Sequence, residues 1–207
     1  MKLRPGDEIS YEVFYLEMRT SPKFEWPKKP SGDIFISNSV KPSSRYFFDL
    51  YKAVGGDYEW TDKFELPTSE IDFFLCHPLV RMFTFFKDGW TAGFFMLDYR
   101  VTGICDLAYF GLVPEAIGFG YGKYMLKVAV KEGWNRNGTK LLTVNTNSLD
   151  HPNALPLYKK IGFMLKNKKK ATRVLTKSRY KDSYKTDNHG WNHISSFRHK
   201  SNYLHEK

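Results

Sequence analysis

The sequence predicts a mixed α/β domain in which a central sheet is flanked by helices. Runs rich in β-branched and aromatic residues, typical of strands, alternate along the chain with segments whose apolar residues recur at helical spacing. One strand-like run gives way directly to a helical pattern through three alternating glycines, Gly118, Gly120 and Gly122. The 207 residues include 17 Phe and 13 Tyr, which is enough apolar surface for one sizeable core.

The first half of the chain is predicted to hold one strand, two helices and then the beginning of a sheet. Residues 9–18 form the first strand, and three prolines make residues 20–33 a loop. A helix begins at Ser43 or Ser44, whose hydroxyl can cap it, and ends at the glycine pair at 55–56. A second helix begins within residues 67–70 and ends near Pro78.

Strands dominate the centre of the chain, and helices alternate with strands after it. Residues 79–86, 91–99 and 105–112 are predicted strands, with a hairpin turn at Gly89 between the first two. A long helix covers residues 121–136, a strand residues 141–146 and a short helix residues 153–160. A final hairpin is predicted from two strands, residues 163–166 and 171–178.

Charge divides the chain into two parts, a domain at residues 1–180 and a basic, His-rich tail at residues 181–207. The net charge is +10, and residues 164–207 carry 12 basic against 3 acidic side chains, so the preceding part is nearly neutral. The tail is too polar to build a core and is predicted to be disordered or loosely docked. Two alternatives stay open: contact with nucleic acid or another anionic surface, and docking of Trp191 and Phe197 on a partner subunit.

Several classes of protein are disfavoured by what the sequence lacks. It has no N-terminal apolar run and no stretch of about 18 apolar residues, so we expect neither a signal peptide nor a membrane helix. Cys76 and Cys105 both lie in apolar stretches, which predicts buried free thiols and a cytoplasmic location. Cys and His residues show no metal-binding spacing, so no metal is expected.

The three glycines predict a phosphate site, because they let the chain turn sharply and expose N–H groups at a helix N-terminus. The dinucleotide fingerprint does not fit, since Gly122 comes one residue early. The Walker A loop does not fit either, because Ile117 replaces its first glycine and Tyr124 replaces the magnesium-binding hydroxyl residue. The remaining alternative is that the glycines only form the turn between the strand and the helix and bind no ligand.

A third kind of phosphate loop fits the residues. A strand, Pro114-Glu115, the three glycines and an apolar helix start together resemble the acetyl-coenzyme A loop of the GNAT superfamily of N-acetyltransferases. Residues 154–163 are similar to that superfamily's second signature, a short helix ending in a Leu-Tyr…Gly-Phe pattern. Two motifs in the right order are more specific than one. The resemblance covers roughly residues 9–180 and looks like a bacterial branch whose substrates are mostly unassigned.

The resemblance implies a GNAT-like, mostly antiparallel sheet that splays between its fourth and fifth strands, residues 105–112 and 141–146. Acetyl-coenzyme A is then the implied co-substrate. Two positions depart from the family pattern: Ile117 stands where Arg or Gln is usual, and His151 stands where Asn is common. The residues implied for cofactor binding are Leu112, Val113, Gly118, Phe119, Gly120, Tyr121, Gly122, Lys123, His151 and Tyr158.

Two residues are implied to be catalytic. Tyr158 matches the tyrosine that protonates the leaving thiolate, although a tyrosine there can also simply pack its ring on the core. Asp106 stands about where the family often carries a glutamate base, and its shorter side chain would act through a water. Asp106 is equally well read as the exposed residue of an alternating strand. Tyr109, Asp150 and Glu115 are weaker candidates for the base, and His151 can also cap the short helix.

The function predicted from these motifs is transfer of an acetyl group from acetyl-coenzyme A to a primary amine. A nucleic-acid-binding protein that uses its basic tail is one alternative, and a coenzyme A sensor without catalysis is another. The acceptor cannot be deduced from the sequence, and a homodimer is neither required nor excluded.

Overall fold

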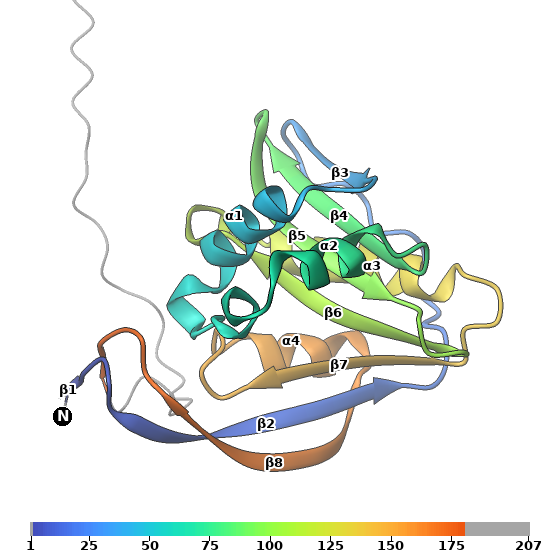
Figure 1. Cartoon of the computed structure of the whole chain (residues 1–207). Helices are drawn as coiled ribbons and strands as arrows, with labels where there is room; N and C mark the ends of the chain where they lie inside the picture. Colours follow the sequence, from blue (N-terminus) through green and yellow to red (C-terminus); the bar gives the residue numbers. More distant parts are fainter. Residues whose placement is uncertain (1, 181–207) are drawn as a thin grey trace, which may run out of the picture.

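A computed structural model of the chain describes residues 2–180, and the predicted tail at residues 181–207 lies outside the described residues (Figure 1). One sheet of this part has the strand order β3-β4-β5-β6-β7-β2-β8, and all its neighbours are antiparallel except β6 and β7. Its strands are β2 (Glu8–Met18), β3 (Ile34–Ser39), β4 (Val80–Lys87), β5 (Trp90–Asp98), β6 (Ile104–Leu112), β7 (Leu141–Asn147) and β8 (Met164–Val174). The predicted mixed α/β class, with a mostly antiparallel sheet, is confirmed.

The helices lie on both faces of this sheet. In Figure 1, α1 and α2 lie in front of the strands, and α3 and α4 lie behind them. The bounds are α1 (Ser44–Gly55), α2 (Thr68–Cys76), α3 (Tyr121–Trp134) and α4 (Ala154–Ile161), with short 3-10 helices η1 (Gly56–Tyr58), η2 (Asp62–Glu65) and η3 (Pro114–Ala116). A separate pair of short strands, β1 (Lys2–Leu3) and β9 (Arg179–Tyr180), lies beside the main sheet. None of the helices in the described part combines the length and apolarity needed to cross a membrane.

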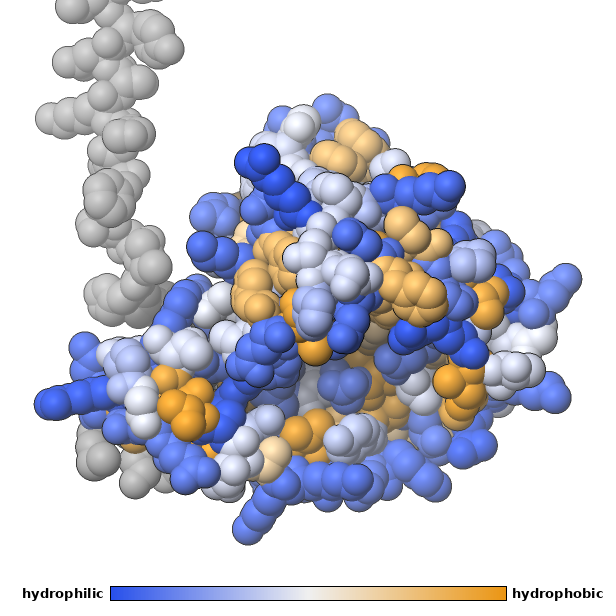
Figure 2. Space-filling model, viewed as in Figure 1, coloured by the Kyte–Doolittle hydropathy of each residue, from blue (hydrophilic) through white to orange (hydrophobic). Residues whose placement is uncertain are grey.

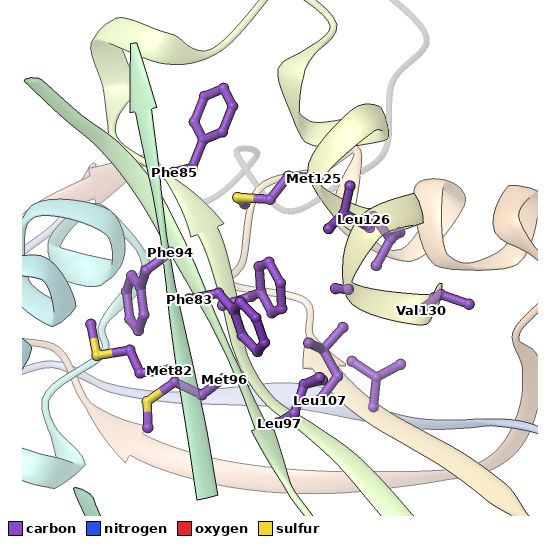
Figure 3. Packing of buried hydrophobic residues seen from close by; sticks show 14 of the residues in the cluster. Met82, Phe83, Phe85, Phe94, Met96, Leu97, Leu107, Met125, Leu126 and Val130 are labelled. Atoms are coloured by element: carbon purple, nitrogen blue, oxygen red, sulfur yellow. The ribbon is translucent and has the colours of Figure 1, made fainter. Parts of the chain in front are cut away.

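The core fills both faces of the central strands. Figure 3 shows Phe94 and Met82 on the side of α1, and Phe83, Phe85 and Leu97 on the side of α3. These side chains are at most 5% exposed. Because helices cover both faces, the middle of β4 and of β5 is buried at consecutive positions instead of alternating between buried and exposed residues.

A bulge in β6 explains why the sheet opens next to it. Leu107 is opposite Leu97 and Tyr109 is opposite Met96, which leaves Ala108 as an extra residue on β6. A bulge bends a strand and increases its twist. Accordingly, β6 pairs with β7 only from Ile104 to Asp106, and the two strands then diverge (Figure 1). The predicted splay between these strands is confirmed.

Three details differ from the sequence-based expectation. Residues 163–178 are not a hairpin, because β8 is one continuous strand that pairs along nearly all of β2. Residues 34–39 form the edge strand β3, which the mixed pattern Ile-Phe-Ile-Ser-Asn-Ser did not predict. Cys76 is exposed at the end of α2, so only Cys105 is the buried free thiol that was expected.

The other edge strand, β8, is strongly basic. Its residues are exposed at almost every position, and four lysines stand within residues 166–170. Lysines on an edge strand oppose pairing with the strands of other molecules. The charge of this strand therefore has a structural explanation.

Candidate active site

The glycine loop between β6 and α3 leaves a row of backbone amides without partners. Gly118 and Gly120 adopt φ values of +94° and +80°, which favour glycine, and Gly120 is the N-cap of α3. Within residues 2–180, none of the amides of residues 118–123 donates a hydrogen bond to a protein atom. The first turn of α3 contains no acidic side chain. Free amides and a helix N-terminus together favour a bound anion.

The side chains of the loop leave this row of amides accessible. Tyr121 is buried against Phe85, whereas Phe119 is 64% exposed and stacks on Tyr121. Lys123 is exposed on the first turn of α3, where an ammonium can reach an anion held by the loop. A Cβ atom added at Gly118 or Gly120 would meet no protein atom within 4 Å, so the space in front of these two residues is open.

Gly122 faces the space between β6 and α4. A Cβ atom there would lie 3.8 Å from a methyl group of Leu112 on β6 and 3.9 Å from one of Leu157 on α4. A side chain longer than alanine at this position would therefore extend into the space between Leu112 and Leu157. The open space and the free amides of the loop suit an anionic group such as a diphosphate.

The open side of β6 carries backbone groups that pair with no strand. The Val113 amide donates to Ala92 at 3.0 Å, so the amide of Val113 is not available to a cofactor. In an antiparallel ladder, successive residues direct their N–H and C=O groups to opposite sides. By this alternation Phe110 and Leu112 direct theirs away from β5, into the gap where β7 has separated.

The facing strand β7 contributes in the same way. Ser148 donates its amide to Glu12 at 2.8 Å, which fixes the alternation along β7 and β2. Asn145 then directs its backbone groups toward the gap. Unpaired peptide groups from Phe110, Leu112 and Asn145 thus line the gap, and an amide-containing arm can pair with them as a short extra strand.

Tyr158 is held at this gap by the end of α4. Gly162 has a φ of +114° and closes the helix, since its amide donates to Lys159 and the next amide donates to Tyr158. The Tyr158 ring makes edge contacts with Phe110 and Phe163. Its hydroxyl has no hydrogen-bond partner among the described residues, and burial, with a smaller effect of Asp150, raises the pKa of the phenol. A neutral, unpartnered phenol in this position can donate its proton.

Asp150 is a structural carboxylate rather than a free base. It accepts hydrogen bonds from the Trp60 indole at 3.0 Å, the Thr146 hydroxyl at 2.7 Å and the Asn147 amide at 2.9 Å. Trp60 belongs to the segment after α1, and a Cβ at Gly111 of β6 would lie 4.0 Å from its ring. The bond from Trp60 to Asp150 therefore ties a residue packed over β6 to the end of β7, across the gap.

His151 lies in the turn before α4, whose N-cap residue is Asn153. Its Nδ1 accepts a hydrogen bond from the Asn153 amide at 3.1 Å, and its carbonyl accepts one from Ala154 at 2.8 Å. Burial lowers the pKa of the imidazole. His151 thus stabilises the turn that leads into α4 without being its N-cap, and Nε2 is the nitrogen left to donate.

Asp106 lies at the closed end of the gap, on the face covered by α1 and α2. Its carboxylate accepts a hydrogen bond from the hydroxyl of Thr143 on β7. Burial raises the pKa of Asp106, the bond from Thr143 offsets part of this effect, and Asp98 adds to it. A carboxyl group with a raised pKa is a better base than an exposed aspartate. Of the weaker candidates, Tyr109 is enclosed by aromatic rings, and Glu115 is exposed on η3, beyond the end of the gap.

The comparisons with known proteins agree with this geometry. The model of the acetyltransferase (GNAT) family matches residues 47–163, more than half of the chain. The chain belongs to this family. The matched segment includes both the glycine loop and the helix of Tyr158. No curated protein matches the chain in sequence.

Solved GNAT structures share the fold at low sequence identity. A GCN5-related N-acetyltransferase from Kribbella flavida is 15% identical with a TM-score of 0.54, covering 78% of this chain and 56% of that one. One from Sphaerobacter thermophilus is 14% identical with a TM-score of 0.57, covering 83% of this chain and 52% of that one. The present chain thus spans about half the length of these two proteins. An aminoglycoside acetyltransferase from an uncultured soil metagenomic sample is 15% identical with a TM-score of 0.50, covering 62% of this chain and 87% of that one.

Sequence reasoning missed two features of the site. Trp60 and Asp150 lie 90 residues apart, so no local pattern could indicate their hydrogen bond. The backbone role of Asn145 follows only from the strand alternation. As to metals, no cluster of three or more His, Cys, Asp or Glu side chains suited to an ion occurs in residues 2–180.

Proposed function

We propose that this GNAT family member is an N-acetyltransferase that uses acetyl-coenzyme A and a primary amine. The observation that carries the proposal is the row of unpartnered amides at residues 118–123, which opens toward the gap where Tyr158 lies. The amides would hold the diphosphate, and the backbone of Phe110, Leu112 and Asn145 would align the arm. Acetyl-coenzyme A would supply the thioester, whose carbonyl carbon accepts the amine.

The two proposed catalytic residues reach this gap from opposite faces of the sheet. Asp106, on the face of α1 and α2, accepts a proton from the acceptor ammonium, through a water because its side chain is short. The freed amine forms the N–C bond as the C–S bond breaks. Tyr158, on the side of α4, donates its phenolic proton to the sulfur that leaves, and the second proton that the nitrogen loses as the amide forms restores the phenol. An amide directed into the gap by Phe110 or Leu112 stabilises the charge that develops on the carbonyl oxygen.

Calorimetry with coenzyme A tests the loop, using two matched glycine variants. Gly120→Ala and Gly138→Ala place the same side chain at similar φ values, +80° and +88°, with no protein atom within 4 Å of either Cβ. Both are expected to destabilise the fold by about 1–2 kcal/mol. Only Gly120→Ala is expected to weaken coenzyme A binding, by at least about tenfold.

Gly122→Glu extends the same test. The glutamate side chain would fill the space beside Leu112 and place a negative charge next to the amides. Binding of coenzyme A should then be lost, while the thermal unfolding curve still shows a folded protein. If both loop variants bind coenzyme A as tightly as Gly138→Ala does, the proposed function is wrong at its first step.

A further inference from the structure

A pocket that does not include the glycine loop lies on the face of the sheet covered by α1 and α2. A pocket of about 550 Å³ opens between these helices and the ends of β5 and β6. Figure 2 shows this face, where apolar and charged side chains surround a hollow below α2. Asp106 belongs to the pocket lining, so the pocket reaches the residue proposed as the base. Its volume suits a small molecule rather than a folded partner.

The charges of the pocket leave one negative charge without a compensating cation. Asp98 is paired with Arg100 through three hydrogen bonds of 2.7–3.0 Å from the guanidinium. Glu70 and Lys63 also line the pocket and cancel in net charge without forming an ion pair within residues 2–180, so the lining as a whole carries a net charge of −1. The remaining carboxylate is Asp106, and its side-chain partner in the described part is the neutral hydroxyl of Thr143. The lining thus balances one positive charge and not several.

The remaining walls are largely apolar and aromatic. Phe73 is 70% exposed on α2, at the pocket lining. Tyr109 stands inside with its ring edge against Phe47, and Phe74 lies under the Arg100 guanidinium at 4.8 Å. The flat aromatic rings of such a lining can pack against an aliphatic chain or a ring of a ligand.

We infer that this pocket binds the acceptor, and that the acceptor is a small monoamine with an apolar or aromatic body. Its ammonium lies at Asp106, and its body lies between Phe73 and Tyr109. This rests on the proposed acetyl transfer and narrows it. Polyamines and aminoglycosides carry several positive charges, which exceed the single net negative charge of the lining.

An amine panel tests the class of acceptor. Release of free thiol from acetyl-coenzyme A is measured with 2-phenylethylamine and hexylamine as monoamines, and with spermidine and kanamycin as polycations. We expect kcat/KM to be at least about tenfold higher for the two monoamines, because the lining compensates only one charge. A preference for spermidine or kanamycin would overturn the inference.

Two Phe variants locate the binding site of the amine. Phe73→Ala removes an exposed ring of the pocket and should raise KM for 2-phenylethylamine about tenfold, with little effect on kcat. Phe35→Ala removes a ring that is 45% exposed on the distant edge strand β3 and should leave KM unchanged. An unchanged KM in Phe73→Ala would place the acceptor elsewhere.

The outcomes separate this inference from the proposed function. One outcome is that coenzyme A binds through the glycine loop while thiol is released only with polycations, or with no amine of the panel. In either case the inference fails and the loop assignment stands. If coenzyme A does not bind, the proposed function itself fails.

Discussion

Replacing Tyr158 with Phe removes one hydroxyl and leaves the ring contacts with Phe110 and Phe163 in place. The hydroxyl has no hydrogen-bond partner in residues 2–180 and lies in a fully buried site. Its loss should therefore change the free energy of unfolding by less than about 1 kcal/mol, and removal of a buried, unsatisfied group favours the folded state. Loss of a general acid should lower kcat by about 10²-fold or more. The KM for acetyl-coenzyme A should change little, since the loop amides are untouched.

Tyr99→Phe is the matched control. Tyr99 is also buried, but its hydroxyl donates to the Glu132 carbonyl at 3.0 Å, away from the gap. This variant should lose about 1 kcal/mol of stability and keep its kcat. The pair is compared by thermal unfolding and by steady-state thiol release. A Tyr158→Phe enzyme with normal kcat, or one that loses both stability and coenzyme A binding, would refute the role of Tyr158 as the acid.

Three further changes probe the walls of the site. Gly111→Ala places a Cβ 2.2 Å from Val54, so we expect a loss of about 1–3 kcal/mol in thermal unfolding, partly recovered by adding Val54→Ala; additive losses would contradict the contact. Trp60→Phe removes the indole donor of Asp150, and should cost about 1–3 kcal/mol and lower kcat/KM for the amine; wild-type values would show that the bond across the gap is unimportant. Asp106→Asn should lose the acidic limb of the pH–rate profile. Burial raises the pKa of Asp106, so the folded protein is favoured by the protonated carboxyl group. This contribution to stability is present below the unfolded carboxyl pKa of about 4 and is lost as the pH rises through the folded pKa. The Asn variant should therefore be more stable than the wild type near neutral pH, but not below about pH 4.

The sequence was sufficient for the parts of the fold that depend on local chemistry. The Ser43 hydroxyl caps α1 as expected, since it accepts the amide of Tyr46. The end of α4 at Gly162 and the splay of the sheet also agree with the expectation, because a left-handed glycine and two ordered motifs leave few alternatives. The two helix ends are indicated by residues next to them, whereas the splay was implied by the resemblance of the two motifs to a known family.

Features that depend on contacts between distant segments were missed. The chain from Met164 onward looks like a broken hairpin because lysines interrupt it, yet its pairing with β2 keeps it one strand. The bulge at Ala108 has no glycine or proline to mark it and becomes visible only from the register with β5. For the site, the sequence indicated Tyr158 and the loop, but not the bond between Trp60 and Asp150, and it could not decide between the two roles of His151.

In the proposed function, the amides of residues 118–123 hold the diphosphate of coenzyme A. Backbone ¹⁵N–¹H spectra recorded during a titration with coenzyme A test it most directly. We expect large downfield proton shifts for these amides, and much smaller ones when the ligand is pantetheine, which lacks the diphosphate. Binding of coenzyme A that leaves these six amides unshifted while others move would contradict it.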